Sequence, residues 1–78
     1  MKIELTAEVD ENHLVIVSDN VFLVYGTGRT LTEALRDYTR SLQEYFHILI
    51  RHKEHLSPQL QENLDSLHAL NQRDNNEQ

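Results

Sequence analysis

The sequence of 78 residues contains no cysteine, no tryptophan, a single proline and only two glycines. Without cysteine the chain has no disulfide, no thiol nucleophile and no thiolate ligand for a metal ion. A chain this short buries only about 60% of the surface that its unfolded form exposes, so its own core is small. Because no disulfide reinforces that core, we expect further stabilisation to come either from association with another chain or from an unusually regular core.

Positive charge is also scarce, because seven Lys and Arg residues stand against 13 Asp and Glu residues, for a net charge of −6. Non-specific binding to nucleic acid takes most of its affinity from Lys and Arg side chains that neutralise phosphates. We therefore expect no direct contact with nucleic acid. Since complementary potentials steer association, a protein partner of this acidic chain is expected to be basic.

Long hydrophobic runs are missing as well. The longest, residues 14–17 and 21–25, are far shorter than the roughly 20 residues of a membrane-spanning helix. From residue 2 onwards polar and apolar residues alternate, without the apolar core of a signal peptide. These absences predict a cytoplasmic protein that does not enter a membrane.

The first third of the chain shows the two-residue period of β-strands. Apolar and polar residues alternate over 3–9, and two apolar runs follow at 14–18 and 21–25, each after a polar turn at 10–13 or 19–20. Alternation of this kind is typical of a strand with one buried face, and the short connections are those of hairpins. We predict a three-stranded antiparallel meander.

A loop and a helix start follow the third predicted strand. Gly26 and Gly28 break the strand pattern, and we expect them to let the chain turn sharply towards a helix. Thr30 and Glu33 have the spacing of a capping box, in which a hydroxyl and a carboxylate each accept a hydrogen bond from a free backbone amide.

Apolar residues then recur every three or four positions over 31–56 and predict a long amphipathic helix. Ser57 and Pro58 are typical of the cap and first position of a second helix. That helix carries a narrow apolar stripe of Leu60, Leu64, Leu67 and Leu70. The fold class predicted is α+β with the order βββαα, as one domain over residues 1–70 and a disordered polar tail over 71–78.

The second and third predicted strands are apolar on both faces. Two helices cover one face of a small sheet, and the chain has nothing left for the other. An exposed apolar face is typical of a partner surface. The candidate partner or oligomer interface is Val15, Val17, Phe22 and Val24, or the alternate set of residues on the same strands.

Motifs for catalysis, metals and cofactors are incomplete. His52 and His55 have helical spacing, but zinc needs a third protein ligand, and none is clearly placed. No histidine is paired with a convincing nucleophile, and the segment 26–30 matches neither the dinucleotide nor the Walker glycine pattern. We predict no catalytic residue, no metal site and no cofactor, and the role of the five histidines stays open.

Residues 28–35 read Gly-Arg-Thr-Leu-Thr-Glu-Ala-Leu. This segment resembles the Gly-x-Thr-x-x-Glu-Ala-Leu signature that joins the third strand to the first helix in HicB-like antitoxins, and the element order agrees over residues 3–49. The resemblance implies a partial ribonuclease H-like fold that binds and blocks a small basic toxin that cleaves RNA. In it, Arg29, Thr30 and Glu33 would shape the loop and cap the helix.

The chain departs from that family in three ways. It has Ser-Asp-Asn-Val-Phe at 18–22 in place of a Pro-Asp-Leu-Pro-Gly-Cys-like segment, and a helix from residue 57 in place of a fourth strand. It also lacks the C-terminal DNA-binding domain, so DNA binding is not implied.

These observations predict a non-enzymatic protein-interaction module that associates with itself and neutralises a small basic RNA-cleaving toxin. The alternative is a homo-oligomeric regulatory or scaffold module without a toxin. The adjacent gene separates the two, because an antitoxin is expected beside its toxin. The sequence leaves the partner, the sheet face that binds it and the choice of dimer or tetramer open.

Overall fold

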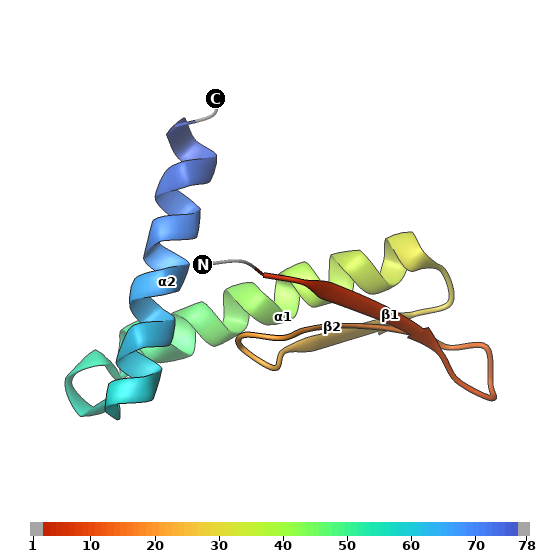
Figure 1. The fold of residues 1–78 in the computed structure, drawn as a ribbon, viewed down its shortest axis with the longest axis horizontal. Helices are drawn as coiled ribbons and strands as arrows, with labels where there is room; N and C mark the ends of the chain where they lie inside the picture. Colours follow the sequence, from red (N-terminus) through yellow and green to blue (C-terminus); the bar gives the residue numbers. More distant parts are fainter. Residues whose placement is uncertain (1–2, 77–78) are drawn as a thin grey trace. The chain divides into compact units, whose positions relative to one another are not determined.

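The computed structural model describes residues 3–76, with side chains for residues 3–70. The elements in chain order are β1 (Leu5–Val9), β2 (Val15–Asp19), β3 (Tyr25–Gly28), α1 (Leu31–Arg51), a short 3₁₀ helix η1 (Lys53–His55) and α2 (Pro58–Asn76) (Figure 1). This is the α+β arrangement with the order βββαα that the sequence predicts. Within the described residues, neither helix has the length and apolar content that crossing a membrane requires.

The chain forms two compact units, Met1–Tyr45 and Phe46–Gln78. The single domain over 1–70 and the polar tail over 71–78 stay predictions, and α2 continues to Asn76. Residues 77–78 lie outside the described part of the chain.

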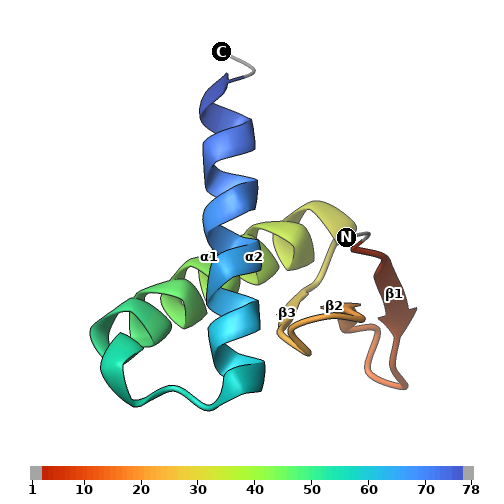
Figure 2. The same ribbon diagram turned by 60° about the vertical axis from the view of Figure 1, so that its left-hand side comes forward.

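The first unit contains an antiparallel sheet in the order β1-β2-β3, with β1 as an outermost strand (Figure 2). In the register, Ala7 lies opposite Val17, which in turn lies opposite Gly26. The predicted third strand over 21–25 is wrong in its position, because β3 begins only at Tyr25. The residues before it form a loop that the Asp19 carboxylate holds through hydrogen bonds to successive backbone amides.

The core of this unit lies between the sheet and α1. Val17, Ala34 and Tyr38 are buried together, and Val15, Val24 and Leu42 pack against them. Phe22 is buried beside Tyr45, with 6.2 Å between the ring centroids. The helix therefore covers β2, β3 and the loop that joins them.

The second unit consists of the end of α1, η1 and α2. The long helix predicted to reach residue 56 ends at Arg51, and the chain turns through η1. Ser57 caps α2 as predicted, since the backbone amide of Leu60 donates to its hydroxyl at 3.3 Å. Leu64 and Leu67 of the predicted stripe are buried, and Leu60 and Leu70 are half-buried.

Candidate interaction surface

The predicted helix cap is present at the start of α1. The backbone amide of Glu33 donates to the Thr30 hydroxyl at 3.1 Å, and the backbone amide of Arg29 donates to the Glu33 carboxylate at 3.0 Å. The carboxylate thus binds the amide one residue before the cap, where the usual box would use that of Thr30 itself. The arrangement fixes the point at which the chain leaves β3 and enters the helix.

Gly26 and Gly28 have a different role from the predicted sharp turn. Both lie inside β3, and neither has a positive φ. A Cβ atom on Gly26 would lie 2.1 Å from the backbone nitrogen of Tyr38, and one on Gly28 would lie 2.5 Å from the Cβ of Glu33. The absence of side chains at these two positions is what allows the backbone of α1 to lie directly against β3.

The outer edge of β3 is closed by α1. The amide of Asp19 donates to the carbonyl of Val24, so Asp19 and Val24 form a hydrogen-bonded pair. Along an antiparallel pair every second residue bonds to the neighbouring strand, so the amide of Thr27 points away from β2, to the outer edge. That amide donates to the Asp37 carboxylate at 2.9 Å. Arg40 also pairs with Asp37. The hydrogen bond from Thr27, followed by that from Arg40, holds the pKa of Asp37 below its ordinary value.

Within the described residues of the first unit, the outer edge of β1 has no paired strand and is open. The amide of Asp10 donates to the carbonyl of Leu14, so the bonds between β1 and β2 fall on Thr6 and Glu8 by the alternation of an antiparallel pair. The N–H and C=O groups of Leu5, Ala7 and Val9 consequently point away from β2. All five residues of β1 are exposed.

The apolar side chains of β1 lie on the face of the sheet that α1 covers elsewhere. Leu5, Ala7 and Val9 stand opposite Asp19, Val17 and Val15, and residues directly opposite share a face. Yet Leu5 is 50% exposed and Val9 65% exposed, whereas Val17 beside them is only 1% exposed. The helix covers β2 and β3 and stops short of β1.

One flank of α1 continues this uncovered apolar area. Asp37 lies on the flank of α1 that faces the outer edge of β3, because it binds the Thr27 amide there. Successive residues of a helix are about 100° apart, so Leu35 lies roughly 160° around the helix axis from Asp37, on the opposite flank. Leu35 and Leu31 are therefore on the flank towards β1, and both are exposed. We call the side chains of Leu5, Ala7, Val9, Leu31 and Leu35, with the open edge of β1, the β1 surface.

The interface predicted from the sequence lies elsewhere and is not open. Val17 and Phe22 are buried, and Val15 and Val24 pack against the core, because α1 covers this face. The prediction of these four residues as a partner surface is thus corrected to a core. Of the alternate set, Leu23 is 80% exposed in the loop before β3.

The opposite face of the sheet is mainly polar. It carries Thr6, Glu8, Ile16, Ser18, Tyr25 and Thr27. The expectation of a third strand apolar on both faces was wrong because residues 21–24 lie in a loop and not in a strand. For β2 the expectation agrees with the structure only at Ile16, which lies on the face opposite Val15 and Val17. The β1 surface was missed because the alternation over 3–9 is the same for a covered strand and for an uncovered edge strand.

Asp19 is a buried polar side chain of the first unit. Its side chain is buried, with one oxygen accepting the amides of Val21, Phe22 and Leu23 at 2.6 to 2.9 Å, and the other accepting the Tyr38 hydroxyl at 2.7 Å.

Burial alone raises the pKa of a carboxyl group, but the hydrogen bond from Tyr38 and those from the three loop amides outweigh it and hold the pKa of Asp19 below its ordinary value. Burial and the neighbouring carboxylate raise the pKa of Tyr38. These two side chains are therefore a charged carboxylate and a neutral phenol that join β2, its loop and α1.

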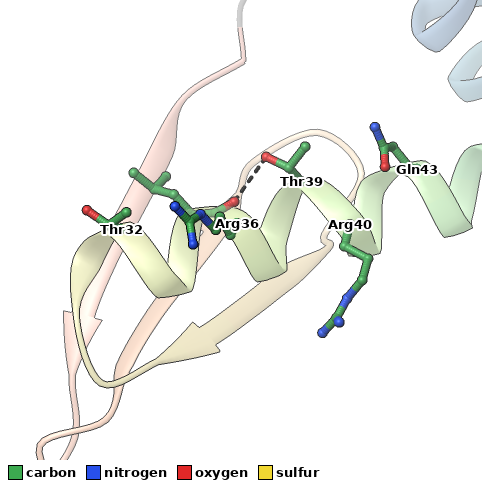
Figure 3. A pocket seen from close by; sticks show the side chains of 6 residues that line it. Thr32, Arg36, Thr39, Arg40 and Gln43 are labelled. Carbon is green, nitrogen blue, oxygen red and sulfur yellow. Dashed lines mark hydrogen bonds between the residues drawn. The ribbon is translucent and has the colours of Figure 1, made fainter.

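The described part of the chain offers no clear metal site, and one of its hollows lies on a single helix. No group of three or more histidine or carboxylate side chains there is placed to hold a metal ion. The hollow drawn in Figure 3 is lined by Thr32, Leu35, Arg36, Thr39, Arg40 and Gln43, all from α1. A depression between side chains of a single helix has no opposing wall, so it cannot enclose a substrate.

Comparison of the chain with family models, with curated proteins and with solved structures gives no match. The resemblance of residues 28–35 to the HicB-like signature is thus supported by these residues and not by a matching family model or structure.

Proposed function

We propose that this chain is a non-enzymatic protein-interaction module. The observation that carries the proposal is the β1 surface, where an unpaired strand edge lies beside apolar side chains such as Val9 and Leu31 that α1 leaves exposed. Open edges and uncovered apolar patches favour association with another chain.

A structural role for Asp19 supports the non-enzymatic part of the proposal. Asp19 is the one buried carboxylate among the described residues, and a buried carboxylate is a natural candidate for acid or base catalysis. Both of its oxygens, however, are occupied by the loop amides and by Tyr38. Such a group stabilises the fold and has no free oxygen to offer a substrate.

The more specific proposal is an antitoxin-like role, in which the module binds and neutralises a small basic RNA-cleaving toxin in the cytoplasm. The signature at residues 28–35 supports it, as does the net charge of −6. Glu4, Glu8 and Glu11 are exposed in the first hairpin and provide a negative surface for a basic partner.

Calorimetric titration of the chain with a small basic ribonuclease encoded by the adjacent gene tests this role. We expect stoichiometric binding that abolishes RNA cleavage, and weaker binding, with a slower association rate, for the Glu4→Lys/Glu8→Lys variant. Glu62→Lys is the matched control, since Glu62 is exposed on α2. Absence of binding to such a ribonuclease would remove the antitoxin role.

The second candidate is a homo-oligomeric regulatory or scaffold module with no toxin. An open strand edge can pair with the same edge of a second copy, so the β1 surface supports self-association with or without a toxin partner. The two candidates differ in whether the purified oligomer binds the product of the adjacent gene.

A further inference from the structure

We propose that β1 pairs antiparallel with β1 of a second copy of this chain, centred on Ala7, so that the two three-stranded sheets become one continuous sheet. This inference rests on the proposed function as an interaction module, and it specifies the occupant of the β1 surface. The centre on Ala7 is the one antiparallel register that pairs every residue of Leu5–Val9.

The backbone groups of β1 suit this pairing. Leu5, Ala7 and Val9 point their N–H and C=O groups to the open edge, as the bond from Asp10 to Leu14 shows. In the Ala7-centred register, Ala7 faces Ala7 of the second copy, and Leu5 faces Val9. Each such pair exchanges two N–H···O bonds, so all the outward groups of the strand find partners.

The side chains fit the same register. On the face towards α1, every cross-strand pair is apolar, which stabilises an antiparallel pair. On the other face Glu8 lies opposite Thr6 of the second copy, so the two Glu8 carboxylates within the paired strands avoid each other. Glu4 and Asp10 face each other only beyond the ends of the paired segment Leu5–Val9. A shift by two residues in one direction would place Glu8 opposite Glu8, and in the other direction opposite Glu4, at a cost in repulsion.

The pairing also covers the rest of the β1 surface. The two-fold axis of this register is perpendicular to the sheet, so both α1 helices lie on one face of the continuous sheet. Their flanks with Leu31 and Leu35 then border a floor formed by Leu5, Ala7 and Val9 of both copies. The helix flanks add area to the strand pair, as a stable interface of about 1,000 Å² or more requires.

A second copy fits the edge better than an unrelated strand, because the edge is self-complementary in hydrogen bonding and in apolar pattern. Proteins that keep an edge strand unpaired commonly place charged residues, above all lysine, or proline on it. β1 has no lysine or proline in Leu5–Val9, its single charged residue is Glu8, and the three residues whose backbone groups point to the open edge are apolar.

Sedimentation equilibrium of the full chain tests the pairing. We expect a dimer whose dissociation constant is raised about tenfold or more by Ala7→Pro and by Val9→Lys. Proline at residue 7 removes an outward amide that β2 does not use, and Val9 is exposed within one copy, so neither change removes a contact inside the chain. Leu23→Lys is the matched control and should not change the dimer, although Leu23 is the more exposed side chain.

A monomeric wild-type chain would overturn the pairing, and so would a dimer that Leu23→Lys weakens as much as Ala7→Pro and Val9→Lys do. A monomer whose Leu5, Ala7 and Val9 amides become protected on addition of the basic ribonuclease would also overturn it, because a partner strand would then fill the edge. That last result would leave the proposed function intact, whereas a monomer that also binds no partner would remove both.

Discussion

The two outer strands of the sheet differ in how their edges are treated. At β3 the helix backbone lies against Gly26 and Gly28, and the Thr27 amide that points outwards is bonded to Asp37. At β1 the outward groups meet no described element of the first unit, and the apolar side chains of Leu5 and Val9 stay exposed.

The difference shows how much of the sheet α1 covers. A single helix covers about two strands of a sheet, and here the glycines of β3 fix which two by allowing the closest approach at that edge. β1 is left uncovered by α1 as a consequence. The proposed second chain would bind at this strand, which lies outside the interface predicted from the sequence.

Adding a side chain at Gly26, where α1 lies against β3, should have the largest effect on the free energy of unfolding. In Gly26→Val, the new side chain collides with the backbone of Tyr38 and Ala34, which cannot move without displacing α1. We expect a loss of about 3 kcal/mol or more in the free energy of unfolding, measured by denaturant titration. Ala7→Val, on the same face at the open edge, is the control and should change it by less than about 0.5 kcal/mol at a protein concentration at which the chain is monomeric.

Removing the Asp19 carboxylate should have the next largest effect. Asp19→Ala leaves three loop amides and the Tyr38 hydroxyl without their acceptor, and we expect a loss of about 3 kcal/mol. Asp10→Ala is the comparison, since Asp10 holds the amides of Asn12 and Leu14 in a similar but more exposed loop. An equal loss in both variants would contradict the importance of burial at Asp19.

The same carboxylate should make stability depend on pH. The folded pKa of Asp19 lies below the ordinary value of 3.8, so its contribution is complete above that value and is lost as the pH falls through the lowered pKa. The free energy of unfolding of the wild-type chain should therefore fall from about pH 5 downwards. In Asp19→Asn this fall should be shallower, and parallel curves for the two proteins would refute the assignment.

Tyr38→Phe should have a smaller effect, because it keeps the packing of the ring and removes only its hydrogen bond to Asp19. We expect a loss of about 1.5 kcal/mol, within the range for a hydrogen bond to a charged group. Tyr25→Phe is the matched control on an exposed ring and should be neutral. Thermal unfolding followed by circular dichroism measures both.

Asp37→Asn should have the smallest effect on stability. Its main effect should be on hydrogen exchange at the β3 edge, which tests whether Asp37 closes that edge. The Thr27 amide loses a charged acceptor, so we expect its hydrogen exchange to accelerate and that of Glu8, at the other side of the sheet, to stay unchanged. Unchanged exchange at Thr27 would mean that Asp37 does not close the β3 edge.

The sequence predicted the elements well where a local pattern carries the information. The Thr30 and Glu33 cap and the Ser57 cap each depend on residues a few positions apart, and both are present. The position of β3 was missed because Asp19 holds the following loop through contacts that no periodicity encodes. The open edge was missed for a related reason, since the strand order and the reach of α1 decide whether an alternating strand is covered.

The most direct test of the central claim is amide hydrogen exchange in β1 as a function of protein concentration. At low concentration we expect Thr6 and Glu8 to be protected by β2, and Leu5, Ala7 and Val9 to exchange rapidly. At high concentration the second set should become protected as well, in step with the dimer fraction. Rapid exchange of Leu5, Ala7 and Val9 at every concentration would contradict the claim that β1 is the edge at which two copies join.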